Sequence, residues 1–112
     1  MDLDQRQVVM NREQELSMSA WDHLVIAQRE LRRSGAPILV SIGLPYKEGP
    51  RTWAVAFRIE GIEEEPLEET VRGADSAEAL ISALRTIAAV IDSWNADHSI
   101  TWNGRTDLGF SP

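Results

Sequence analysis

The chain has 112 residues, of which 43% are hydrophobic and 26% are charged, and its formal net charge is −7 at pH 7. This length suits one domain with a modest core. The absence of cysteine excludes disulfides, thiolate metal ligands and cysteine nucleophiles. The negative charge disfavours nucleic acid and anionic membranes as direct partners, because both attract clustered Lys and Arg.

Neither a membrane span nor a secretory signal is predicted. No apolar run approaches the roughly 18 residues that a spanning helix needs, and the N-terminal stretch has no basic segment followed by an apolar one. We therefore expect a cytoplasmic protein. The polar residues 1–20 predict a poorly ordered arm or a short surface helix, and residues 21–112 predict a single domain.

The segment 21–34 fits two interpretations. Its basic C-terminal residues, followed by Gly35, are typical of the end of a helix. However, Val25 and Ala27 alternate with polar neighbours, and the following Ser-Gly-Ala can turn directly into a next strand. We favour a strand over residues 24–33.

The middle of the chain reads as short strands separated by turns. Residues 38–43 are β-branched and apolar, and residues 46–50 form a turn cluster rich in Gly and Pro. Residues 53–60 alternate, and residues 67–72 form a weaker strand. A short strand is predicted near the C-terminus, over residues 100–102. In the alternating strand, one face carries Trp53, Val55, Phe57 and Ile59, and the other carries Ala54, Ala56, Arg58 and Glu60.

An amphipathic helix is predicted over residues 75–94. Asp75 and Glu78 have the spacing of a capping box, in which each side chain satisfies a free backbone N–H of the first turn. The apolar stripe comprises Ala77, Leu80, Leu84, Ile87, Ile91 and Trp94. A helix of about 20 residues needs to bury such a stripe to be stable, so it implies a sheet to pack on.

These elements predict an α+β fold, with an antiparallel meander of about four strands, a short C-terminal strand, and one long helix on one face. The apolar face of residues 53–60 is the natural partner of the helix. The other face, with Ala54, Ala56 and Arg58, suits either solvent or a partner.

Four stretches appear together in this order: IAQREL (26–31), TWAVAFRIEGI (52–62), GADSAEAL (73–80) and ITWNGRTDLGF (100–110). As a set they resemble an uncharacterised family of small bacterial domains, a domain of unknown function, with an IAxRxL opening, a GxDSxxAL helix and a DLGF ending. The resemblance covers about residues 24–111. It implies an α+β fold and a bacterial or phage origin, and it assigns no catalytic residues.

No motif for catalysis, metal binding or a cofactor is present. His23 and His98 lie in no metal-ligand spacing, and surface or capping roles are favoured for both. Asp92, Asp97 and Asp107 are near enough in sequence to be gathered in space, but they lack an EF-hand spacing. We expect a protein that is not an enzyme and has no cofactor.

Residues 60–69 are the candidate binding site of this sequence. Between residues 60 and 69 the chain has no Lys or Arg and six glutamates, namely Glu60, Glu63, Glu64, Glu65, Glu68 and Glu69. The simplest interpretation is a solvated loop. The alternative is a binding patch that would steer a Lys/Arg-rich surface, with Arg58 and Trp53 as neighbouring anchors.

The sequence therefore suggests a non-enzymatic protein-binding module, of the inhibitor or immunity type, whose partner is a protein with a basic surface. Alternatives are a phage-type anti-defence inhibitor or an adaptor that forms a homodimer through an open sheet face or an edge strand. A small enzyme or ligand binder is least favoured, because no nucleophile–base pair can be identified.

Overall fold

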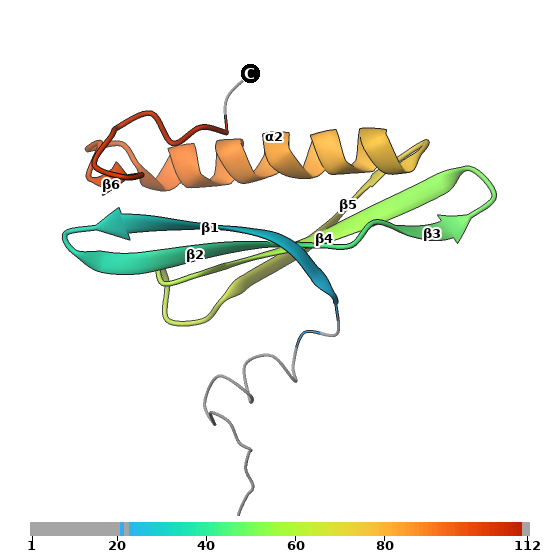
Figure 1. Cartoon of the computed structure of the whole chain (residues 1–112), viewed down its shortest axis with the longest axis horizontal. Coiled ribbons are helices and arrows are strands. Elements are labelled where there is room, and N and C mark those ends of the chain that lie inside the picture. Colours follow the sequence, from blue (N-terminus) through green and yellow to red (C-terminus); the bar gives the residue numbers. More distant parts are fainter. Residues whose placement is uncertain (1–20, 22, 111–112) are drawn as a thin grey trace, which may run out of the picture.

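The computed structural model describes residue 21 and residues 23–110. The predicted polar arm over residues 1–20 lies outside this part. One helix lies across one face of an antiparallel sheet (Figure 1), which confirms the predicted α+β fold. The elements are β1 (Val25–Arg33), β2 (Ala36–Gly43), β3 (Tyr46–Gly49), β4 (Thr52–Glu60), β5 (Leu67–Gly73), α2 (Ser76–Trp94) and β6 (Ile100–Thr101).

All strand pairs of the sheet are antiparallel, and from β1 to β5 the chain follows a meander in which β2 and β3 both pair with β4. β1 pairs with β2, and β4 pairs with β2 at one end, with β3 at the other, and with β5 along nearly its whole length. β5 occupies one edge of β4, so β2 and β3 share the opposite edge. β6 adds a two-residue pairing to β1. The strand favoured over residues 24–33 is confirmed as β1, and the helical alternative is wrong.

The turn predicted over residues 46–50 is wrong in extent, because Tyr46–Gly49 is a strand. β2 and β3 are two parts of one strand, interrupted where Pro45 has no N–H for the ladder. The turn itself lies at Pro50 and Arg51. Lys47 pairs opposite Trp53, so a segment rich in turn-forming residues becomes a strand by pairing with β4.

The core lies between α2 and the sheet. Phe57 on β4 and Ile87 on α2 are fully buried at its centre. The helix stripe is rotated from the predicted one: Ala77 is exposed, whereas Ala79 and Ala83 are buried. Two alanines at this contact allow a close approach of backbones that larger residues would prevent. The buried apolar set comprises Leu31, Ile38, Val40, Ile42, Val55, Phe57, Ile59, Ala79, Ala83, Ile87, Ile91 and Ile100.

The predicted cap opens α2. Asp75 Oδ1 accepts a hydrogen bond from Glu78 N–H at 2.7 Å, as in a capping box, but the Glu78 carboxylate accepts its bond from Ala74 N–H, one residue before the N-cap, and not from Asp75 N–H. Just before this cap, Gly73 ends β5 against the helix. A β-carbon there would lie 2.5 Å from Ala79 N. Only glycine lets β5 pass so close to the first turn of α2.

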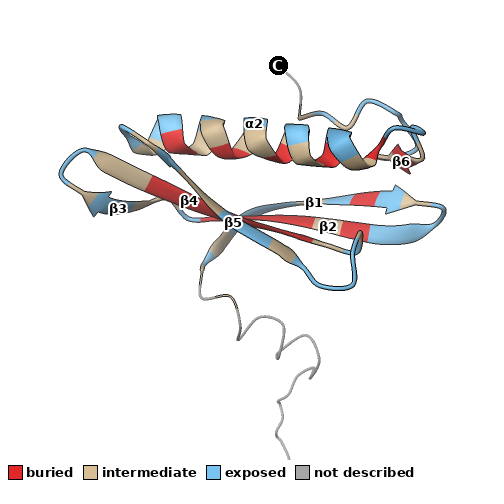
Figure 2. Cartoon of the chain, turned by 180° about the vertical axis from the view of Figure 1, so that it is seen from behind, coloured by how far each residue is buried: buried red, intermediate tan, exposed pale blue. Residues whose placement is uncertain are grey.

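The sheet face opposite α2 is not open at its centre, contrary to expectation. Ala54, Ala56 and Arg58 are 0%, 1% and 5% exposed, and Figure 2 colours the middle of β4 as buried. We call the sheet face opposite α2 the back face. Part of its cover comes from the segment before β1, because a β-carbon on Gly43 would lie 3.2 Å from His23 Cβ.

His23 belongs to a short stack of rings beside this cover. Its imidazole lies 5.7 Å from the Tyr46 ring at an interplanar angle of 28°, and 5.3 Å from the Trp21 ring. Leu24 O accepts a hydrogen bond from Leu44 N–H at 2.8 Å, which extends the pairing of β1 and β2. These contacts place His23 in a packing role.

Candidate functional site

The acidic stretch forms the end of the hairpin between β4 and β5, and we call residues 60–69 the acidic hairpin end. Glu63, Glu64 and Glu65 lie in the connection and are exposed. Gly61 starts the connection with φ of +104°, and a β-carbon there would collide with the carbonyl oxygen of Pro37. The turn therefore needs glycine both for its left-handed backbone and for space against the start of β2.

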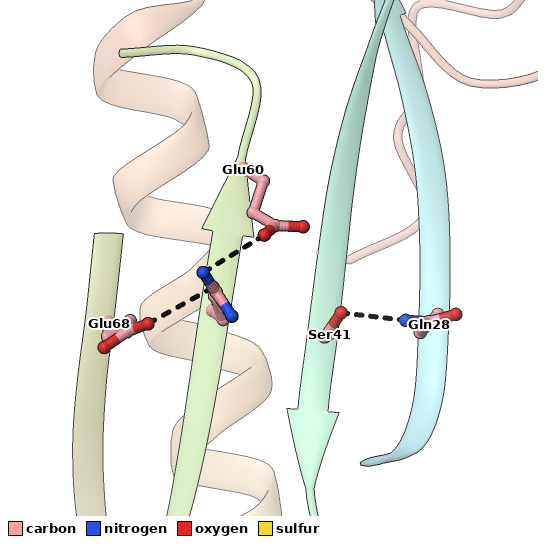
Figure 3. A network of polar contacts seen from close by, with 5 residues as sticks. Gln28, Ser41, Glu60 and Glu68 are labelled. Atoms are coloured by element: carbon pink, nitrogen blue, oxygen red, sulfur yellow. Dashed lines mark hydrogen bonds and ion pairs between the residues drawn. The ribbon is translucent and has the colours of Figure 1, made fainter. Parts of the chain in front are cut away.

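Arg58 sits beneath this end with its side chain 6% exposed, on the back face of β4. Its Nη2 lies 3.3 Å from Glu60 Oε2, and its Nε lies 3.2 Å from Glu68 Oε2 (Figure 3). On the same face, Gln28 Nε2 donates a hydrogen bond to Ser41 Oγ at 3.0 Å. The Arg58–Glu68 contact joins β4 to β5. Because the side chains of Glu60 and Glu68 are 32% and 35% exposed, solvent screens both pairs, and each contributes less than a fully buried ion pair would.

The structure separates the predicted site residues. Glu60 and Glu68 lie close together, because each makes an ion pair with Arg58. Glu69 points to the other face of β5, opposite Phe57. Trp53 packs against the core at the far end of β4, about 23 Å from Glu60 at the usual rise per residue. Arg58 and Trp53 therefore do not form exposed anchors beside the acidic loop.

A second arrangement, which sequence reasoning did not identify, lies at the C-terminal tail after β6. The guanidinium carbon of Arg29, on β1, is 3.8 Å from the centre of the Trp102 ring and 4.8 Å from that of Phe110. Arg29 Nη1 also donates a hydrogen bond to Leu108 O at 3.0 Å. The arginine of the IAxRxL stretch and the DLGF ending, 79 residues apart, are thus in direct contact.

Local features of the tail fit this contact. Asp107 Oδ1 accepts a hydrogen bond from Gly109 N–H at 3.0 Å, which tightens the turn. Gly109 has φ of +78°, and a β-carbon there would lie 2.6 Å from the Trp102 ring and 2.7 Å from Arg29 Nη1. Arg105 covers Trp102 as well, at 4.5 Å. The DLGF ending therefore holds the tail against β1 through its contacts with Arg29.

Two surface grooves flank the C-terminal end of α2. The first, of about 390 Å³, lies between α2 and the tail and is lined by Ala88, Ala89, Ile91, Asp92, Asn95, His98, Thr106, Asp107, Leu108 and Phe110. The second, of about 490 Å³, is lined by Arg33, Ser34, Trp94, Ala96, Asp97 and Ser99. The grooves thus divide the three aspartates considered from sequence.

As far as the described residues line them, neither groove gathers three or more side chains that could ligate a metal ion. Within residues 21 and 23–110, no group of three or more His, Cys, Asp or Glu side chains is placed to hold a metal ion. Asp97 is engaged locally, because hydrogen bonds from the Ser99 hydroxyl and backbone N–H lower the pKa of its carboxyl. His98 occupies a turn with φ of +56° and donates its backbone N–H to Asn95 O at 3.0 Å.

The fold and these sites define a small α+β domain, in which one helix packs on an antiparallel sheet and the C-terminal tail is held against β1 by Arg29. The chain belongs to the family described as a domain of unknown function (DUF6968), which matches residues 27–112. This confirms the resemblance of the sequence motifs to a small domain family of unknown function. Neither a curated protein nor a solved structure matches the chain. Across the described residues, no helix has the length and apolar character to cross a membrane.

Proposed function

We propose that this domain is a non-enzymatic protein-binding module that uses the acidic hairpin end to recognise a protein with a basic surface. The inhibitor or immunity type is the class that we favour. A phage-type anti-defence inhibitor would use the same residues on a different target. The cytoplasm is the proposed location.

The observation that carries this proposal is the charge of the hairpin. From residue 58 to residue 69 the chain has six glutamates and one arginine, which gives five net negative charges. Arg58 lies in ion-pair contact with Glu60 and Glu68, whereas Glu63, Glu64 and Glu65 are exposed on the loop. A fixed group of this kind accelerates encounter with a basic surface and selects against acidic ones.

Rigid support favours a binding role over a merely solvated loop. The paired strands, the buried Arg58 and the steric demand at Gly61 fix where the loop starts and ends. A preorganised loop loses little conformational entropy when a partner binds. The three exposed carboxylates can therefore contribute to affinity without first being ordered.

The test is a single charge reversal in the exposed part of the loop. Glu64→Lys leaves the Arg58 contacts intact, whereas a reversal at Glu68 would also remove an ion-pair partner of the buried Arg58 and so mix an effect on stability with an effect on binding. Glu30→Lys is the matched control, since it makes the same change of charge at an exposed position on β1, where the lost contact is a surface ion pair with Arg32. Quantitative pull-downs from the native host at about 50 mM salt would compare the two variants with the wild type.

We expect a specific basic protein to be captured by the wild type and by Glu30→Lys. With Glu64→Lys, its affinity measured by calorimetry should fall about fivefold or more, with an unchanged melting temperature. The difference between variants should shrink as salt rises. If Glu64→Lys binds the partner as tightly as the wild type at low salt, the acidic hairpin end is not the binding site.

The homodimeric adaptor is the second candidate. The centre of the back face is already buried, so self-pairing would use a strand edge that has no partner within the described residues, namely the outer edge of β5, that of β3, or the part of β1 beyond its two-residue pairing with β6. Glu68, Glu69 and Arg72 place charges along β5, a pattern that discourages edge pairing. Size-exclusion chromatography with light scattering that gives a monomer at all concentrations would eliminate this candidate.

A further inference from the structure

The sheet face that packs on α2 has an apolar end that the helix does not cover. Alternate residues of β2 point to this face, and Ile38, Val40 and Ile42 are buried there. Leu44, the next residue of that alternation, directly follows the strand and is 48% exposed. The apolar surface of the core therefore continues past the end of β2 and becomes exposed.

The start of β1 extends this exposed surface. Leu44 N–H donates a hydrogen bond to Leu24 O at 2.8 Å, so the two leucines lie opposite each other on neighbouring segments of the sheet. Leu24 is 69% exposed, and Ile26, the extra residue of the bulge in β1, is 45% exposed. Figure 1 shows the start of β1 bending away from α2. We call Leu24, Ile26 and Leu44 the uncovered corner.

The uncovered corner concentrates the exposed apolar side chains of the described surface. It contains three of the four large hydrophobic residues that the described part of the chain exposes, and the fourth is Ile81 on α2. Residues 23–28 and 41–46 also contain no Asp, Glu, Lys or Arg, in a chain of which 26% is charged. A contiguous apolar patch is typical of a protein–protein contact, and its occupant needs an apolar surface rather than a charged one.

The corner is complementary in charge to a second copy of itself, because it is uncharged and the charge of the chain lies elsewhere. Ile42 pairs with Phe57, so Leu44 lies about five residues along the sheet from Glu60, or about 17 Å at the usual rise per residue. This is about twice the Debye length at physiological salt, so repulsion between the acidic hairpin ends of two copies is largely screened at the corner. A two-fold rotation then sets the same apolar patch of each copy against the other.

The exposed edges of the sheet lack this property. The edge strand β5 carries Glu68, Glu69 and Arg72, and β3 carries Lys47 and Glu48. Two copies that met along either edge would bring these charged side chains out of water, which costs free energy unless each finds a partner. The uncovered corner imposes no such cost.

We propose that two copies of this chain associate through the uncovered corner, with Leu24, Ile26 and Leu44 of one copy packed on the same residues of the other. The inference rests on the homodimeric candidate, for which it supplies a side-chain interface in place of a strand edge, and it does not involve the acidic hairpin end. Three large side chains from each copy make a small interface, so the association is weak, with a dissociation constant of about 10–100 µM.

The test is sedimentation equilibrium of the full chain between about 1 and 500 µM, a range that brackets the expected dissociation constant. Leu44→Lys places a charge in the contact. Ile81→Lys is the matched control, because it makes the same change of charge at an aliphatic residue that is 47% exposed. We expect a monomer–dimer equilibrium in the wild type, a dissociation constant within about twofold of it for Ile81→Lys, and one at least about tenfold higher for Leu44→Lys.

A second variant and a second measurement locate the contact. Leu24→Lys changes the residue on the opposite segment and should weaken the dimer as Leu44→Lys does, so it decides the matter if Leu44→Lys fails to fold. Both variants keep the backbone hydrogen bond that joins the two positions. Amide chemical shifts of the ¹⁵N-labelled wild type should move with concentration at residues 24–27 and at Leu44, and should stay constant at residues 60–69.

Three results would overturn the proposal. A wild type that stays monomeric up to about 500 µM would leave the corner to a different protein. A dimer that neither Leu24→Lys nor Leu44→Lys weakens would place the contact elsewhere on the molecule. Equal weakening by Ile81→Lys would show that the corner has no special part in the association. None of these results bears on Glu64→Lys, which tests binding through the acidic hairpin end.

Discussion

Arg29 is expected to act as the clamp that holds the C-terminal tail on the sheet. The substitution that tests this is Arg29→Met, which keeps an unbranched side chain of similar length and removes the guanidinium. The lost contacts are one charged hydrogen bond to Leu108 O at 3.0 Å and two ring contacts, with Trp102 at 3.8 Å and Phe110 at 4.8 Å.

The magnitude follows from these contacts. A hydrogen bond from a charged donor contributes about 1.5–3 kcal/mol net, and a partly exposed cation–π contact about 0.5–1 kcal/mol. Because the contacts share one group, they are not additive, and we expect a loss of about 2 kcal/mol in the free energy of unfolding. For a domain of this size, that corresponds to a fall of about 8–16 °C in melting temperature.

Arg32→Met is the matched control, since Arg32 lies on the same strand but is exposed, with a surface ion pair to Glu30 at 2.6 Å. That pair should contribute less than about 1 kcal/mol. Both variants would be followed by chemical denaturation and by trypsin cleavage after Arg105, an exposed arginine at the start of the tail. Only Arg29→Met should accelerate that cleavage under native conditions.

Two outcomes would refute the reasoning on Arg29. Equal destabilisation by Arg29→Met and Arg32→Met would show that the stacked guanidinium has no special value. A loss of stability without faster cleavage after Arg105 would show that Arg29 supports the sheet rather than the tail.

Two further predictions concern the helix junction and the response to acid. Gly73→Ala should destabilise the protein by about 1–3 kcal/mol by denaturation, because its β-carbon would lie 2.5 Å from the Ala79 backbone nitrogen. Gly49→Ala, with nothing within 4 Å of the new atom, should be neutral or slightly stabilising, and an equal loss in both would contradict the packing argument. The second prediction concerns Glu48, whose exposed carboxylate accepts a hydrogen bond from Arg72 Nε at 2.8 Å. This hydrogen bond lowers the pKa of the Glu48 carboxyl. Stability from Glu48 is therefore full above the ordinary pKa of about 4.5 and lost as pH falls through the lowered value, so wild type should lose more melting temperature than Glu48→Gln between about pH 5 and pH 3.

The outline of the fold was predictable because its signals are local. The 3.6-residue period and the cap of α2 depend on neighbours within one or two turns, and the alternation of β4 depends on the next residue along the chain. The same local rules failed at β3. A segment with Lys47, Gly49 and Pro50 has turn-like composition, and it is a strand because of its pairing with β4.

The rotation of the helix stripe has a similar origin. Ala77, Ala79 and Ala83 have the same side chain, so composition cannot indicate which of them faces the sheet. The answer depends on Gly73, which brings β5 against the Ala79 backbone and so fixes the face of the helix that is buried. That contact joins two elements, and neither element alone predicts it.

Candidate sites were harder to predict than the fold because charge in a sequence does not show its partners. Arg58 appeared to be a surface anchor, yet it is buried between Glu60 and Glu68. Arg29 was noted in the sequence only as the arginine of the IAxRxL stretch, yet it binds the tail. In both cases an arginine joins segments that the chain separates, whereas the carboxylates of Glu63, Glu64 and Glu65 are exposed on the hairpin loop. Those carboxylates are where recognition of a basic partner should be sought, because the paired ones already contribute to holding the fold together.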